Sequence, residues 1–217
     1  MEKLITVKGI GNINIKPDLI IVNMELVSNK DSYDETMKVA TESIDKLSVC
    51  LEEVGIDRSE LKTTNFDIRR KYESYYDEDN NYKDRFDGYE CNQQLRLELD
   101  LDMEKLSNII EAITLSGVDP KFNIRFSVKD KNAVNEEILI NATENARKKA
   151  EILVKASNEK LGDIVSIDCS FSDIDISSDT TYQVQEKIGY MEQAYSPSIQ
   201  PEDIKINDTV TFVWKIK

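Results

Sequence analysis

Cysteines and carboxylates are the side chains of this sequence that could carry chemistry, because histidine is absent from all 217 residues. Without histidine, Ser-His-Asp and Cys-His catalysis, His-ligated zinc or haem, and the usual general base near neutral pH are excluded. Cys50, Cys91 and Cys169 stand 41 and 78 residues apart, which also excludes zinc clusters and C-x-x-C redox motifs. Three isolated thiols fit a reducing compartment better than a disulfide framework.

The cysteines are predicted to serve packing rather than catalysis. Cys91 and Cys169 share the alternation of the apolar residues in their predicted strands. Cys50 falls near the C-terminal end of a predicted helix, where the helix dipole disfavours a thiolate. With 42 acidic residues some carboxylates must lie close together, but no motif singles out a catalytic pair. We therefore expect a protein that is not an enzyme, with no catalytic residue, cofactor or metal.

Gly9-Ile10-Gly11 is similar to the start of a dinucleotide-binding loop. The third glycine of that motif is replaced by Asn14, and a second strand follows where the motif requires a helix. We expect these glycines to mark a bulge or a sharp bend within a strand.

Asp77, Asp79 and Asn81 match the first three ligand positions of a calcium loop. The glycine and the glutamate that the loop needs further on are replaced by Tyr82 and Gly88, so an EF-hand is excluded. Weak calcium binding by clustered carboxylates stays open as an alternative to a solvated acidic loop.

The charge balance argues against nucleic-acid and membrane partners. Lys and Arg number 28 and Asp and Glu 42, a net charge of −14, which repels phosphate backbones and anionic lipid. The longest early apolar run, Leu19 to Val22, is too short for a signal peptide or a membrane span. As written, the chain is expected in the cytoplasm; the periplasm or secretion is the alternative if this is a processed form.

Apolar periodicity predicts an α+β fold, in which helices pack on one side of a mostly antiparallel sheet. Strands are expected near residues 5–15, 20–26, 64–76, 89–101, 122–128, 165–171 and 210–216, and helices near 32–54, 102–117 and 132–157. The order is β-β-α-β-β-α-β-α-β-β. Val165, Ile167, Cys169 and Phe171 are expected to share one packed face. No composition break suggests a linker, so residues 1–217 are predicted to form a single domain.

Two segments do not fit regular elements. Residues 73–88 are acidic and rich in tyrosine and are predicted to form the loop of a long hairpin. Residues 173–203, with Pro197 and Pro201, are predicted to form an acidic loop.

Five tyrosines fall within eighteen residues, and this cluster has two possible interpretations. They could pack on the face of a hairpin, or they could form a contact with another protein, where tyrosine is enriched. These candidate interface residues are Tyr72, Tyr75, Tyr76, Tyr82 and Tyr89.

The helix near 132–157 has an imperfect apolar stripe, because Asn135, Asn145 and Lys149 fall inside it. Either Lys149 snorkels, with its stem along the apolar surface and its ammonium in water, or part of this face meets another chain. We include Lys149 among the candidate interface residues.

Several ordered blocks resemble the SIMPL domain family, also known as DUF541. They run from residues 5–11 with Lys16-Pro17-Asp18, through 55–66, 88–101 and 126–130, to 146–151 and Leu161-Gly162. The resemblance covers essentially the whole chain, although Asn158-Glu159-Lys160 replaces a glycine-containing turn. It implies an α+β fold and no established catalytic residues. The family includes a bacterial periplasmic or outer-membrane-associated immunogenic antigen, a protein linked to oxidative-stress tolerance, and a mammalian kinase-binding adaptor.

These observations predict a protein that works by contact. The antigen in the family assembles into a ring-like, channel-shaped oligomer, so the resemblance favours a self-associating protein, with a role in stress tolerance as one expectation. A monomeric adaptor for a partner protein such as a kinase is the alternative.

Overall fold

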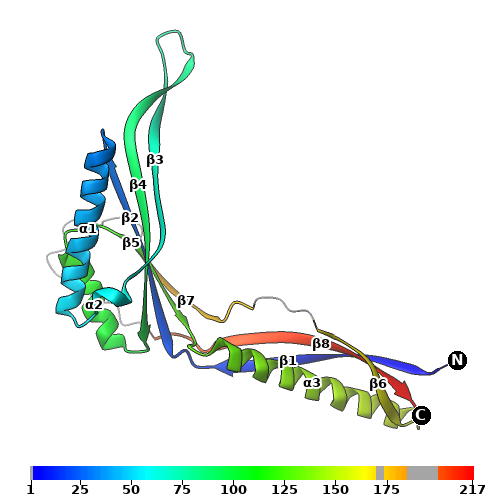
Figure 1. The fold of residues 1–217 in the computed structure, drawn as a ribbon. Helices are drawn as coiled ribbons and strands as arrows, with labels where there is room; N and C mark the ends of the chain where they lie inside the picture. Colours follow the sequence, from blue (N-terminus) through cyan, green and yellow to red (C-terminus); the bar gives the residue numbers. More distant parts are fainter. Residues whose placement is uncertain (1, 170–173, 185–199) are drawn as a thin grey trace. The chain divides into compact units, whose positions relative to one another are not determined.

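The chain folds into two compact units, which the computed structural model describes over residues 2–169, 174–184 and 200–217. Unit 1 contains Met1–Asp18, Ser127–Asp179 and Pro201–Lys217, and unit 2 contains Leu19–Phe126 and Thr180–Gln200. The described elements (Figure 1) are, in chain order, β1 (Leu4–Ile15), β2 (Leu19–Lys30), α1 (Tyr33–Glu53), η1 (Arg58–Glu60), β3 (Lys62–Tyr76), β4 (Tyr82–Asp100), α2 (Met103–Leu115), β5 (Lys121–Ser127), α3 (Lys131–Ala156), β6 (Leu161–Cys169), β7 (Ser177–Val184) and β8 (Ile204–Ile216).

The predicted α+β class is confirmed, with three helices and eight strands among the described residues. The strands form two sheets where the sequence predicts one: β3-β4-β2-β5-β7, largely in unit 2, and β1-β8-β6 in unit 1. The order has one strand more than predicted, because β7 lies inside the expected acidic loop 173–203. Residues 173 and 185–199 of that loop, including Pro197, lie outside the described residues. The single domain predicted for residues 1–217 stays a prediction.

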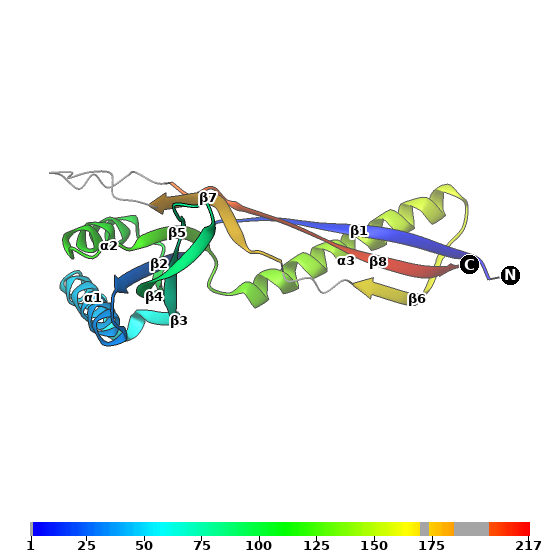
Figure 2. The same ribbon diagram turned by 90° about the horizontal axis from the view of Figure 1, so that it is seen from above.

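Unit 2 packs α1 and α2 on one face of its five-stranded sheet (Figure 2). β2 and β4 are antiparallel, from Leu19 opposite Asp100 to Lys30 opposite Tyr89. Alternate residues of the central strands are buried against the helices, as their apolar alternation predicts. This core includes Ile20, Val22, Met24 and Leu26 of β2, Leu47 and Leu51 of α1, Leu95, Leu97 and Leu99 of β4, Leu106, Ile109 and Ile113 of α2, and Phe122, Ile124 and Phe126 of β5.

Side chains at the helix ends fix where the helices begin and stop. The Ser32 hydroxyl accepts a hydrogen bond from the Glu35 N–H at the start of α1, and Gly55 follows this helix with φ of +79°. Asp102 and Asp130 accept backbone hydrogen bonds at the starts of α2 and α3. The helix positions predicted from the sequence are therefore confirmed to within a few residues.

Unit 1 packs α3 on a three-stranded sheet (Figure 2). β1 and β8 pair without interruption from Leu4 opposite Lys215 to Ile15 opposite Ile204. The helix presents small residues to the strands, so the two backbones come close together. The cluster consists of Val7 of β1, Ala142, Ala146 and Ala150 of α3, and Val210, Phe212 and Trp214 of β8.

The bulge expected at Gly9-Ile10-Gly11 is wrong, because β1 pairs with β8 through these residues without a register shift. These glycines instead allow α3 to approach. A Cβ atom built on Gly9 would lie 2.0 Å from the Ala142 carbonyl oxygen, and one on Gly11 would lie 2.4 Å from the Ile138 carbonyl oxygen. Any side chain at either position would push the helix away from the strand.

The packed face expected for β6 is also wrong. The strand is present, but Val165 and Ile167 are exposed, and of the expected set Cys169 is the one that packs on the core of unit 1. Phe171 lies outside the described residues. The apolar alternation of β6 is typical of a strand that a helix covers. In the structure α3 covers β1 and β8, and residues 163–168 of β6 are exposed.

Candidate protein interface

The hairpin of β3 and β4 extends past the last residue of β2 as a two-stranded arm, residues 71–88 (Figure 1). Lys30 of β2 pairs with Tyr89, and in the described structure the rows beyond that point join β3 and β4 alone. The strands continue through most of the segment 73–88 that the sequence predicts as a loop, and the turn is confined to residues 77–81. Two-stranded hairpins are at best marginally stable in water without further packing.

One face of the arm is aromatic. Tyr72 lies opposite Phe86 and Tyr76 opposite Tyr82, and the rings of each pair meet edge to face with centroids 6.0 and 5.6 Å apart. Between these pairs, the Ser74 hydroxyl donates a hydrogen bond to the carboxylate of Asp84. The exposed fractions are 54% for Tyr72, 50% for Phe86, 67% for Tyr76 and 63% for Tyr82. Four aromatic side chains thus share one exposed surface, which we call the aromatic face.

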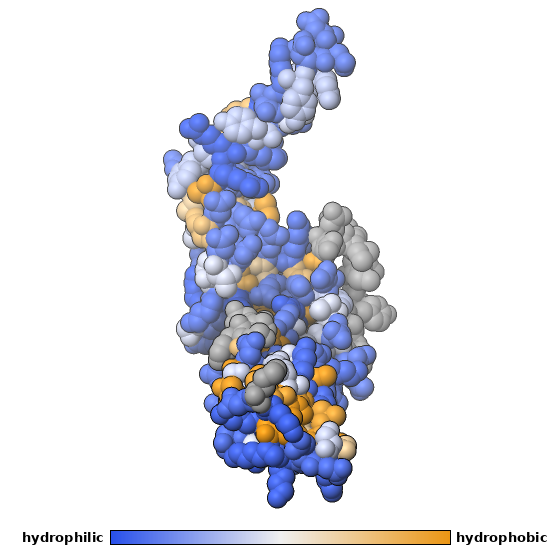
Figure 3. Space-filling model, turned by 90° about the vertical axis from the view of Figure 1, so that its right-hand side faces the viewer, coloured by the Kyte–Doolittle hydropathy of each residue, from blue (hydrophilic) through white to orange (hydrophobic). Residues whose placement is uncertain are grey.

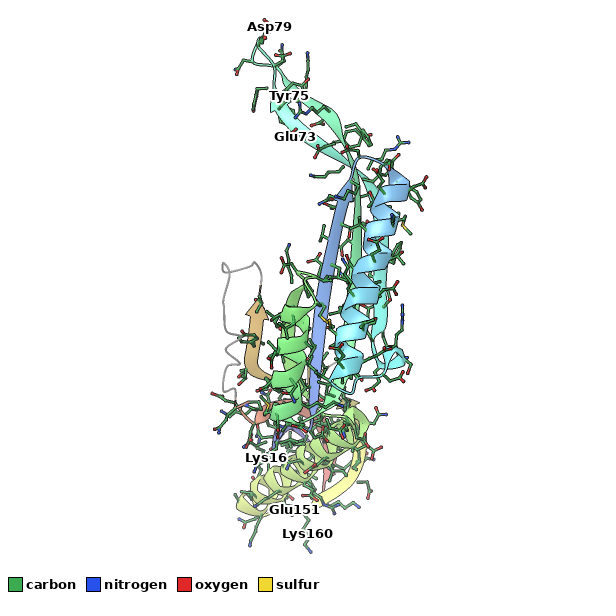
Figure 4. The ribbon with its side chains drawn as sticks, turned by 90° about the vertical axis from the view of Figure 1, so that its left-hand side faces the viewer. Lys16, Glu73, Tyr75, Asp79, Glu151 and Lys160 are labelled. Carbon is green, nitrogen blue, oxygen red and sulfur yellow. The ribbon has the colours of Figure 1, made fainter. Side chains whose placement is uncertain are left out.

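The other face of the arm carries paired charges. Glu73 forms an ion pair with Arg85, and Lys71 lies 2.8 Å from Asp87. The hydrogen bond and the positive charge of Lys71 lower the pKa of the Asp87 carboxyl below its ordinary value. Tyr75 lies on this face, with the Arg85 guanidinium 5.8 Å from its ring centroid. Figure 4 labels Glu73 and Tyr75 on the arm and Asp79 at its turn.

The Asp77 carboxylate is engaged within the turn of the arm. It accepts hydrogen bonds from the N–H groups of Asp79 and Asn81, and it lies 2.6 Å from the ammonium of Lys83. The hydrogen bond from Lys83, followed by the one from the Asn81 N–H, lowers the pKa of Asp77. The three residues that match a calcium loop thus close a hairpin turn, and weak calcium binding there stays a prediction.

The base of the arm is fixed by one glycine and two aromatic contacts. Gly88 has φ of +87°, and a Cβ atom there would lie 2.4 Å from the Lys30 carbonyl oxygen, so this position requires glycine. The ring of Tyr89 meets Phe86 at 5.5 Å and Tyr33, the first residue of α1, at 5.9 Å. Tyr89 therefore connects the aromatic face to α1.

The structure separates the five predicted interface tyrosines. Tyr72, Tyr76 and Tyr82 share the aromatic face, Tyr89 lies at its base, and Tyr75 lies on the charged face. Sequence reasoning missed Phe86, which the cross-strand register with Tyr72 could have identified once the turn was known to be short.

Lys149 has a partner within its own chain, since its ammonium donates a hydrogen bond of 3.2 Å to the Lys8 carbonyl oxygen. Asn145 accepts a hydrogen bond from the Ile10 N–H at 3.0 Å, and Asn141 accepts one from the Asn12 N–H at 3.4 Å. Asn145 and Lys149 thus bind the backbone of β1, whereas the buried side-chain oxygen of Asn135 has no hydrogen-bond partner among the described residues. A contact between Lys149 and a second chain stays a prediction.

The three cysteines are free thiols that are buried or half-buried. Cys91 is fully buried in β4, and desolvation raises the pKa of its thiol. Cys169 is half-buried against the core of unit 1, and Cys50 is half-buried near the end of α1. The packing roles predicted for Cys91 and Cys169 are confirmed.

A polar concavity of about 630 Å³ lies in unit 2, where Asn23, Gln94, Asn123 and Gln183 bring four amide side chains to its lining. Among residues 2–169, 174–184 and 200–217, no three Cys, Asp or Glu side chains are grouped so that they could hold a metal ion. The helices of the described chain are also too short or too polar to span a bilayer.

A family profile described as SIMPL, protein of unknown function (DUF541), matches residues 5–214. The chain belongs to the SIMPL family. It is 27% identical over 164 residues to the 26 kDa periplasmic immunogenic protein of Brucella abortus (strain S19), and 26% identical to the protein of the same name from Brucella melitensis biotype 1. The match covers 75% of this chain and 65% of each relative, so the chain spans slightly less than two thirds of the length of these curated relatives.

The blocks that resemble the SIMPL family occupy structurally constrained positions. Gly9 and Gly11 receive α3, Gly55 ends α1, and Gly88 forms the base of the arm. The block 146–151 includes Ala146 and Ala150, which pack on β1 and β8. These blocks therefore mark close backbone contacts within the fold.

Proposed function

We propose that this SIMPL protein acts without making or breaking covalent bonds, by associating with further copies of itself through the arm. The aromatic face is the observation that supports this proposal. Aromatic side chains supply large contact area at low conformational cost and are enriched where proteins meet. A two-stranded arm gains stability when a partner covers it, so association and folding of the arm would reinforce each other.

The aromatic face is small for an interface that acts alone. Its four side chains are about half exposed, and an aromatic side chain buries about 150–250 Å², so the face offers roughly 400 Å² per copy. Stable interfaces bury about 800 Å² per partner. An assembly built on the arm therefore needs a second contact, as a ring-like or channel-like oligomer would provide.

The names of the two Brucella relatives are relevant to the cellular compartment of this chain. Both Brucella proteins are named as periplasmic, which favours the periplasmic alternative for this chain over the cytoplasmic expectation. A role in stress tolerance follows from the family resemblance alone.

The mass of the purified chain in solution tests self-association. Light scattering at tens of micromolar protein is expected to show a species larger than the 24.9 kDa monomer. Replacing both Tyr76→Ser and Tyr82→Ser is expected to lower that mass, because this removes the two most exposed rings of the aromatic face. Leu115→Ser is the matched control, because Leu115 is 73% exposed at the end of α2, outside the arm.

A monomeric wild-type chain would contradict the proposal and leave the adaptor alternative. An unchanged oligomer in the double tyrosine variant, with circular dichroism showing the fold intact, would remove the arm from the interface.

A further inference from the structure

The two edge strands of the sheet in unit 1 differ in whether side chains of α3 bind their backbone. β1 forms one edge, and α3 lies along it: Asn145 and Asn141 accept hydrogen bonds from the N–H groups of Ile10 and Asn12, and Lys149 donates one to the Lys8 carbonyl oxygen. β6 forms the other edge, and within the described residues its one ladder partner is β8. An edge strand presents a row of backbone donors and acceptors that a further strand can bind.

Three of the exposed side chains of β6 are apolar, beside Asp163, Ser166 and Asp168. Ile164 is 54% exposed, Val165 48% and Ile167 57%, and these β-branched residues favour an extended strand. In Figure 3, hydrophobic side chains gather on the part of unit 1 that faces the viewer. Long apolar edge strands are uncommon on isolated proteins, because they pair with any strand that is available.

We propose that β6 pairs antiparallel with β6 of a second copy across a twofold axis, so that the two three-stranded sheets become continuous. This inference rests on the proposed self-association and supplies the second contact that the arm requires. Backbone hydrogen bonds between the strands would provide affinity, and the exposed Ile164, Val165 and Ile167 would be covered.

The charge pattern of β6 favours a second copy as the partner. With full overlap of Leu161–Cys169, Val165 lies opposite Val165 of the second copy, Asp163 opposite Ile167, and Asp168 opposite Gly162. No acid then faces an acid, and Lys160 of the second copy is the diagonal neighbour of Asp168. A register centred on Asp163 or on Asp168 would instead place two aspartates directly opposite each other, which is unfavourable. The strand is thus complementary to itself in its longest register.

Disulfide cross-linking tests this register. The background is the 217-residue chain with Cys50→Ser and Cys169→Ser, in which the buried Cys91 stays in place. Val165→Cys is expected to form about tenfold more disulfide-linked dimer than Asp163→Cys or Ile167→Cys, because directly opposed Cα atoms lie about 4.5–5.5 Å apart, within the span of a disulfide. Ile152→Cys is the matched control for random collision, because Ile152 is 59% exposed on α3 of the same unit.

Each outcome has a distinct meaning. A peak at Val165→Cys supports the β6 contact. Equal yields at Val165→Cys and Ile152→Cys, or a disulfide to a different protein alone, overturn it. An oligomeric mass without cross-links at any β6 position overturns the β6 contact and leaves the proposed self-association standing. A monomeric mass for the wild-type chain overturns both.

A second variant tests the same contact without cysteines. Val165→Lys places two lysines directly opposite each other in this register, and Val165 is 48% exposed in the single chain, so the fold of unit 1 is expected to persist. Light scattering is expected to show a smaller assembly than the wild-type chain at the same concentration. An unchanged mass would overturn the pairing.

Discussion

At the scale of single residues, Gly9 determines how closely α3 can lie on β1. A methyl group there would meet the Ala142 carbonyl oxygen at 2.0 Å and the Ala146 methyl group at 2.7 Å, and backbone atoms cannot turn away as a flexible side chain can. Gly9→Ala is therefore expected to lower the free energy of unfolding by about 1–3 kcal/mol, the range for overpacked cores. Urea denaturation measures this, with Thr6→Ala, an exposed change on the same strand, as the control.

Asn145 is expected to protect the edge of β1 through a single hydrogen bond. Its side-chain oxygen accepts the Ile10 N–H, which otherwise points away from the β8 ladder. Asn145→Ala should cost about 1 kcal/mol and make the Ile10 amide exchange faster with deuterated solvent. Glu144→Ala, an exposed change one position earlier, should leave the exchange at Ile10 unaltered. Equal protection of Ile10 in both variants would show that the bond contributes nothing.

At the scale of elements, the sequence predicts what is decided locally. The side chains of Ser32 and Asp102, together with Gly55, mark helix ends, and the alternation of apolar residues in β4 and β5 marks the buried face. Strand pairing is not local. β1 and β2 are joined by a short turn at Pro17-Asp18, yet they enter different sheets, because β1 pairs with β8 at the far end of the chain.

The sequence predicts which residues belong to the candidate interface, but not which face of the arm each of them occupies. The cluster of tyrosines indicates a contact surface, but dividing them between two faces requires the register of the hairpin, in which Tyr75 pairs with Lys83 and Tyr76 with Tyr82. The exposure of β6 could not be predicted from the sequence. Its apolar alternation is typical of a strand that a helix covers, and which strands are covered depends on the position of α3 in the fold.

The ion pairs of the arm make its stability depend on pH at the acid end. The Asp87 carboxyl has a lowered pKa in the folded arm, so its contribution is complete above the ordinary value of 3.8 and disappears as the pH falls through the folded pKa. The arm should therefore be less stable in strong acid than at neutral pH.

Carboxyl chemical shifts in an NMR titration measure this dependence. Lys71→Ala should move the titration midpoint of Asp87 upwards, because the hydrogen bond and the charge that lower it are removed. Lys38→Ala on α1 is the control and should leave Asp87 unchanged. A midpoint that stays in place in Lys71→Ala would mean that this ion pair does not persist in solution.

At the scale of the whole molecule, the charge of −14 opposes every contact between copies, whereas the aromatic face and β6 favour it through apolar area. Salt shortens the range of repulsion to about 10 Å at about 0.1 M and leaves apolar burial intact, so association should strengthen several-fold between about 20 mM and about 300 mM NaCl. Asp84→Asn, which removes a carboxylate from the middle of the aromatic face, should strengthen association at low salt and weaken its dependence on salt. Sedimentation velocity distinguishes the cases: if salt dissociates the assembly, the copies are held by opposite charges, and neither apolar surface is the contact.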